Sequence, residues 1–162
     1  MVGEIPGAVM KGDGQLLNAG GSEINWAPWE PQVGDNDEAP TLLAAATALR
    51  RQAGEDFLVY GRMLPPAPIE AIKTMRWQYE GRDHQVPAIF HAAWQSPRQR
   101  FGLVLANWTR EWQEARVSDP RLGRSGALHL AAGRVESTPY AVTGVPLTLH
   151  LPPLSCALLE AD

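Results

Sequence analysis

The sequence predicts a mostly β protein, an antiparallel β-sandwich preceded by an irregular segment and one amphipathic α-helix. Three observations lead to this fold class. Apolar residues recur with helical spacing before residue 54, and with a period of two in several segments after residue 86. Turn-forming residues separate the later segments, as in SPRQR, SDPRLGRSG and STPYAVTG. No helical pattern interrupts this half, which favours an antiparallel sandwich over a parallel β-α-β arrangement.

The irregular segment comes first, and with the helix it forms the first of two expected regions, residues 1–64 and 65–162. Residues 1–36 carry many glycines and little periodicity, and a self-contained domain rarely begins with so long an irregular stretch. We therefore expect this stretch either to wrap another surface or to belong to a larger fold.

The helix is expected after Asn36 or Asp37, either of which suits an N-cap. Two arginines near its end complement the helix dipole, and Gly54 suits the stop. One apolar stripe follows helical spacing: Leu42, Ala45, Ala46, Leu49 and Ala53. Because this stripe is mostly alanine, we expect it to pack closely on a flat neighbouring surface.

The strands of residues 65–162 are expected where apolar and other residues alternate. The segments are VPAIFHAAW, FGLVLAN, GALHLAA, VPLTLHL and SCALLEAD. Their alternation places these residues on common faces: Val86, Ala88, Phe90, Ala92 and Trp94; Phe101, Leu103 and Leu105; Leu128 and Leu130; Val145, Leu147, Leu149 and Leu151. Both faces of FGLVLAN are apolar, so we expect that strand to be buried on one side and partly covered on the other.

Composition and charge exclude several classes of partner. Of 162 residues, 44% are hydrophobic and 20% charged, which is ordinary for a globular domain with a core. The net charge of -4 without a long basic run argues against nucleic acid. The longest apolar run, LLAAATAL, is too short to span a membrane, and the first residues lack the pattern of a secretory signal. Nothing in the chain indicates its compartment.

Motifs that carry chemistry are few. KGDGQLL departs from a nucleotide-binding glycine loop, and DNDEAP departs from a calcium loop. The four histidines lack metal-ligand spacing, and those in the strands are expected to be solvated. Cys156 lies in an apolar segment and is expected to be a small buried residue. We therefore expect no catalytic residue in this chain that can be named from sequence, no metal site and no cofactor.

Tryptophans are the best candidates for binding a ligand, because an exposed indole offers a flat apolar face on which a sugar stacks. Trp26 and Trp29 stand in NWAPWEPQ beside Glu23 and Glu30, and Trp108 and Trp112 stand in NWTREW. Asn107, which tolerates a left-handed backbone, predicts that the chain turns away from the strand before Trp108. The alternative for each pair is packing against the core or another domain, and Glu23 with Glu30 is also a candidate carboxylate pair.

Three segments resemble the C-terminal end of large bacterial glycoside-hydrolase-like proteins with an uncharacterised (β/α)₈ barrel. LLAAATALRRQAGEDFLVYGRMLPP resembles the final barrel helix and its exit, VPAIFHAAWQSPRQRFGLVLANWTREWQEARV resembles a strand pair with an Asn-x-Thr turn, and VPLTLHLPPLSCALLEAD resembles a closing hairpin. The resemblance covers about residues 40–162. It implies a sandwich domain that caps a catalytic barrel, with the catalytic acids outside this chain.

Three functions follow as hypotheses. The first is a non-catalytic accessory domain that packs on and supports the catalytic barrel of such a protein. The second is a carbohydrate-binding module that uses exposed tryptophans, with a carbohydrate ligand as its partner. The third is a small stand-alone glycoside hydrolase.

Overall fold

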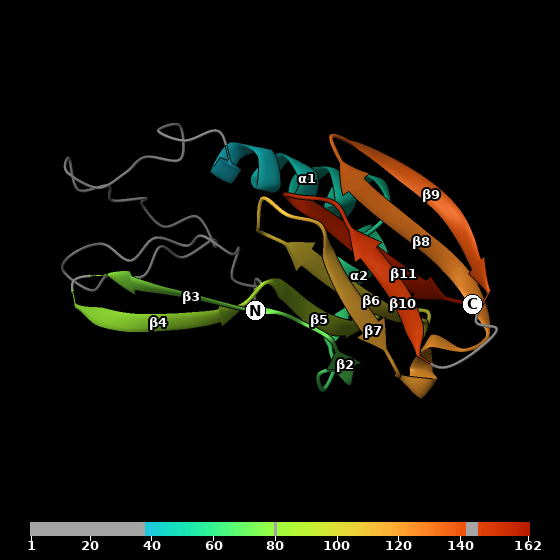
Figure 1. Ribbon diagram of the computed structural model, residues 1–162. Coiled ribbons are helices and arrows are strands. Elements are labelled where there is room, and N and C mark those ends of the chain that lie inside the picture. Colours follow the sequence, from blue (N-terminus) through green and yellow to red (C-terminus); the bar gives the residue numbers. More distant parts are fainter. Residues whose placement is uncertain (1–37, 80, 142–145) are drawn as a thin grey trace. The chain divides into compact units, whose positions relative to one another are not determined.

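The computed structural model describes residues 38–79, 81–141 and 146–162 (Figure 1). The contacts of the chain divide it into two units, Met1–Pro40 and Thr41–Asp162, and the fold described here is that of the second. The expected irregular segment 1–36 and the N-cap at Asn36 or Asp37 lie outside the described residues. That residues 1–64 are a remnant of the end of a (β/α)₈ barrel, as the resemblance implies, stays a prediction. Among the described residues, no helix is long and apolar enough to cross a membrane.

The described elements follow one another along the chain, with strands predominating after the first two helices. They are α1 (Glu38–Gln52), α2 (Glu55–Leu58), β1 (Arg62–Met63), β2 (Ile69–Glu70), β3 (Thr74–Tyr79), β4 (Arg82–Pro87), β5 (Ile89–Gln95), β6 (Phe101–Asn107), β7 (Gln113–Val117), the 3-10 helix η2 (Pro120–Leu122), β8 (Ser125–Ala132), β9 (Arg134–Ala141), β10 (Leu147–Leu151) and β11 (Ser155–Ala161).

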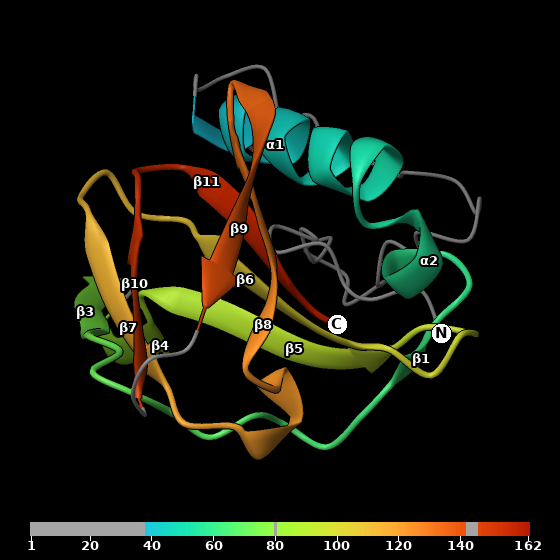
Figure 2. The same cartoon turned by 90° about the vertical axis from the view of Figure 1, so that its right-hand side faces the viewer.

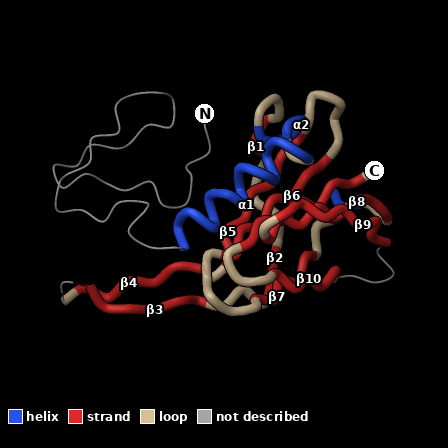
Figure 3. The backbone as a smooth tube through the Cα atoms, turned by 90° about the horizontal axis from the view of Figure 1, so that it is seen from above, coloured by secondary structure: helices blue, strands red, loops and turns tan. Residues whose placement is uncertain are grey.

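All strand pairs that these elements form are antiparallel, so the predicted mostly β, antiparallel fold is confirmed. One sheet has six strands in the order β1-β5-β6-β11-β8-β9, and a second has three in the order β10-β7-β2. The remaining pair, β3 and β4, forms a hairpin of its own (Figure 3). The six-stranded sheet has α1 on one side and β7 and β10 on the other (Figure 2).

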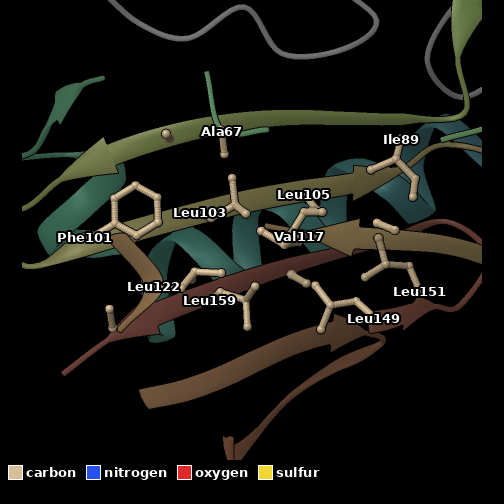
Figure 4. Packing of buried hydrophobic residues seen from close by; sticks show 14 residues of the cluster. Ala67, Ile89, Phe101, Leu103, Leu105, Val117, Leu122, Leu149, Leu151 and Leu159 are labelled. Carbon is tan, nitrogen blue, oxygen red and sulfur yellow. The ribbon is translucent and has the colours of Figure 1, made fainter. Parts of the chain in front are cut away.

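The inner core lies between the six-stranded and three-stranded sheets (Figure 4). Leu103 and Leu105 of β6 and Leu159 of β11 are fully buried there, and β7 and β10 supply residues such as Val117 and Leu151 from the opposite side. The alternation predicted for FGLVLAN is therefore confirmed, since alternate residues of β6 enter this core.

The outer layer is the cluster of residues between α1, α2 and the other face of the six-stranded sheet. Ala45 and Leu49 of α1 and Phe57 of α2 are buried there against Leu158 and Trp94. The predicted helical stripe and its packing on a flat surface are confirmed. The helix ends beside Gly54, as expected, where the backbone N–H groups of Ala53 and Gly54 both donate to the Leu49 carbonyl oxygen.

The segment VPAIFHAAW, expected as one strand, is two strands separated at Ala88. The Ala88 N–H donates to the Lys73 carbonyl oxygen at 2.7 Å, and the side chain is fully buried. Residues before this point pair with β3, whereas those after it enter the six-stranded sheet. Consequently, Ile89 rather than Phe90 enters the inner core, and Phe90 is 36% exposed on the other face.

Candidate functional site

The turn that follows β6 contains the tryptophans predicted as a sugar-stacking pair, and it gives them different surroundings. Trp108 is half-buried, and its indole Nε1 donates a hydrogen bond to the Pro87 carbonyl oxygen at 2.7 Å. Trp112 is 66% exposed. The other predicted pair, Trp26 and Trp29, lies outside the described residues, as do Glu23 and Glu30.

The ring partners of Trp108 come from the hairpin and from β5. Trp77 meets Trp108 edge to face at 6.3 Å between ring centroids, and Phe90 lies against it at 6.4 Å with an interplanar angle of 29°. Trp77 is in turn stacked on its cross-strand partner His84 at 5.5 Å and 15°. We call Trp77, His84, Phe90 and Trp108 the aromatic surface.

Much of the aromatic surface faces solvent, since Trp77 is 44% and Phe90 36% exposed. Indole rings held in fixed orientation by neighbours suit either stacking on a sugar or packing against another protein surface. The sequence pointed to Trp108 but missed Trp77 and Phe90. Their placement depends on the β3–β4 register and on the break at Ala88, which residue spacing alone does not give.

Asn107 makes the turn through its side chain. The chain leaves β6 at Asn107, as predicted, but the backbone φ of Asn107 is not positive, so the turn does not use the left-handed conformation that this residue tolerates. The fully buried amide Nδ2 donates toward the carbonyl oxygens of Glu111, Leu151 and Pro152 at 2.7–3.1 Å, while Oδ1 accepts from the backbone N–H and the hydroxyl of Thr109. Asn107 thus ties the β6–β7 turn to the β10–β11 turn.

A polar cluster lies on the helix-bearing face of the six-stranded sheet, and we call it the outer polar array: Asp56, Arg100, His129, Ser137 and Glu160. The guanidinium of Arg100 pairs with Glu160 and, at 3.1 Å, with Asp56. His129 Nε2 lies 3.3 Å from Glu160 Oε2, and its Nδ1 lies 2.8 Å from Ser137 Oγ. Residue spacing did not predict this array, because Ser137, His129 and Glu160 meet only through the β9-β8-β11 register and Asp56 and Arg100 come from other parts of the chain.

The histidines differ from the expectation that those in the strands are solvated. The side chain of His129 is only 14% exposed, and burial lowers its pKa. Burial also lowers the pKa of His91, whose Nδ1 is buried without a hydrogen-bond partner. His150, by contrast, is exposed as expected.

Cys156 and the potential metal ligands are the remaining side chains with chemistry in the part of the chain that the structure describes. Cys156 is buried as predicted, and burial raises the pKa of its thiol to about 12, so it stays protonated at neutral pH. Within the described ranges, no three histidine, cysteine, aspartate or glutamate side chains are grouped so as to hold a metal ion.

The fold and these surfaces define a mostly β, antiparallel domain with a helix on one face of its larger sheet. No protein-family model matches the chain, and no curated protein is similar enough to be a relative.

Proposed function

We propose that this chain is a non-catalytic β-sandwich accessory domain of a glycoside-hydrolase-like protein, and that it packs on and supports a catalytic barrel. One observation carries the proposal, namely that the first half of α1 exposes uncharged residues on the side that faces away from the sheet. Ala45 and Leu49 point into the outer layer and are 3% and 1% exposed. On the opposite side, Leu43 is 36% exposed and Ala44 and Thr47 are exposed.

Leu43, Ala44 and Thr47 lie on the same side of the first half of α1 and are uncharged, and the next turn of that side carries Arg50 and Arg51. A surface helix normally turns charged and polar residues away from its core, whereas the uncharged first half of this side is a surface that a second layer can cover. The second layer, in this proposal, is the barrel. The resemblance of LLAAATALRRQAGEDFLVYGRMLPP to a final barrel helix and its exit supports the same assignment.

The aromatic surface favours a second candidate, a carbohydrate-binding module. The exposed parts of the Trp77 and Phe90 rings, each packed on Trp108, offer apolar faces on which a sugar ring can stack. Trp112, at 66% exposure, is a further stacking candidate of the same class. In this candidate the ligand is a carbohydrate bound by ring stacking.

Titration calorimetry of the purified chain against a panel of soluble polysaccharides separates the two candidates. The accessory domain predicts no saturable heat with any member of the panel. Saturable heat with one polysaccharide that disappears in Trp77→Ala and persists in Trp94→Phe, a change at a buried tryptophan of the outer layer, contradicts the accessory domain and supports the binding module.

A further inference from the structure

The outer polar array contains a hydroxyl, an imidazole and a carboxylate in series, and no function considered so far uses them. Ser137 of β9 is the register partner of His129 on β8, and their side chains meet at 2.8 Å. Glu160 of β11 reaches the other nitrogen of the same ring at 3.3 Å. The three side chains come from three adjacent strands, so the sheet itself fixes their spacing.

The hydrogen-bond pattern assigns the proton positions in this series. An ionised carboxylate only accepts hydrogen bonds, so Nε2 of a neutral His129 carries the proton and donates it to Glu160. Nδ1 then has a free lone pair, and the Ser137 hydroxyl donates to it. Burial lowers the pKa of His129, which keeps the imidazole neutral near pH 7 and able to accept a proton.

Arg100 holds the Glu160 carboxylate in place, and Asp56 in turn holds Arg100. Arg100 pairs with Glu160 and also with Asp56, and its guanidinium lies 5.9 Å from the centre of the Phe57 ring. Arg100 and Asp56 are therefore positioning residues. Ser137 itself is exposed, so a small molecule in solution can reach its Oγ.

We propose that Ser137 is an activated nucleophile that accepts an acyl group from activated carboxylic esters, with His129 as its general base and Glu160 orienting the imidazole. A hydroxyl bonded to a base that a third group orients is the arrangement by which proteins activate serine. The reaction stops at an acylated Ser137 and involves no turnover, so it is compatible with a non-catalytic domain that docks through α1.

The reaction balances without any further reagent. Ser137 Oγ attacks the ester carbonyl carbon and forms a new C–O bond, while its proton passes to His129 Nδ1. When the tetrahedral intermediate collapses, the bond between the carbonyl carbon and the alkoxy oxygen breaks and the leaving group takes the electron pair. His129 returns the proton to that oxygen or to water, which leaves an acyl-serine and a free alcohol or phenol.

The test is incubation of the full chain with p-nitrophenyl acetate, followed by release of p-nitrophenol and by mapping of acetylated peptides. We expect one acetyl group on Ser137. Ser137→Ala should abolish that adduct, and His129→Gln should slow its formation about 100-fold, since general-base assistance contributes at least that factor in typical cases.

Ser125→Ala is the matched control. Ser125 lies on β8, the strand of His129, and its hydroxyl donates to the Asp162 carboxylate at 2.6 Å, so it has a carboxylate partner in place of an imidazole. The control should acetylate at the wild-type rate. Absence of acetyl-Ser137 in the wild-type chain overturns the proposal, as does an unchanged rate of its formation in His129→Gln when circular dichroism shows that variant to be folded.

Discussion

The two faces of the six-stranded sheet are both apolar, yet they are covered in different ways. The inner face is closed by a second sheet, with leucines from β6, β10 and β11 meeting between the layers. On the outer face, smaller residues such as Ala131 and Cys156 lie beneath α1, which allows the helix to approach closely. Beyond the helix, this face carries the outer polar array and the exposed Phe90.

This difference shows how one set of strands serves two purposes. A face closed by another sheet is filled mainly by apolar side chains that match in shape, and its residues contribute stability. A face covered partly by a helix leaves room at its margins for charged and aromatic side chains. The outer polar array and the exposed Phe90 are therefore found on the outer face, where other molecules can reach them.

Leu158 and Leu159 give the sharpest contrast and the largest expected effects, because they are adjacent leucines, both fully buried, on opposite faces of β11. Leu159→Ala should lower the free energy of unfolding by about 4 kcal/mol, and Leu158→Ala by about 3 kcal/mol. Helix α1 can move into part of the cavity that Leu158→Ala leaves, whereas the two sheets around Leu159 are each held by their own strand hydrogen bonds and cannot close the cavity in the same way. Urea denaturation measures both values, and a larger loss for Leu158→Ala would contradict the comparison.

Asn107→Ala tests the polar end of the inner face. It removes the donor for three carbonyl oxygens and the acceptor for Thr109, so we expect a loss of about 3 kcal/mol in unfolding free energy. Asn107→Asp retains the acceptor atoms but lacks the donor, and it should also destabilise the chain. If either variant unfolds at the wild-type urea concentration, the side chain does not tie the two turns together.

The pH dependence of stability should reflect His91 on the inner face and His129 on the outer face. The pKa of each is lowered by burial from a usual 6.5, so the unfolded chain binds protons more readily than the folded chain. Their contribution is therefore complete above pH 6.5 and is lost as the pH falls below it. Thermal melting of His91→Gln and His129→Gln between pH 5 and 8 should show a weaker acid-side loss than wild type. An unchanged slope in both variants would assign the loss to other groups.

The tryptophans of the β6–β7 turn should give the smallest effects and differ from each other. Trp108→Ala removes a hydrogen bond and two ring contacts, for an expected loss of about 2 kcal/mol in unfolding free energy. Trp112→Ala should change stability by less than about 0.5 kcal/mol because the side chain is mostly exposed. Equal losses in urea denaturation would mean that Trp112 also packs on the domain.

Much of the fold follows from residue spacing, because period-two and helical patterns report which side of an element is apolar. The stripe of Leu42, Ala45 and Leu49 and the alternation in β6 were predicted in this way. Residue spacing does not reveal how strands pair. It therefore did not predict the contact of His129 with Ser137 or that of Trp77 with Trp108. The role of Asn107 was missed because a buried side-chain amide and a left-handed turn favour the same residue.

Light scattering of the wild-type chain beside Leu43→Glu tests the central claim, that α1 presents a second face for another domain to cover. If another domain covers this face, as proposed, the wild-type chain by itself should associate as its concentration rises, because the face would be left open. Leu43→Glu should remain monomeric with an unchanged melting temperature, while Thr148→Glu, the same kind of change at an exposed position of β10, should associate like wild type. A wild-type chain that stays monomeric at every concentration, or association that Leu43→Glu leaves intact, would contradict the claim.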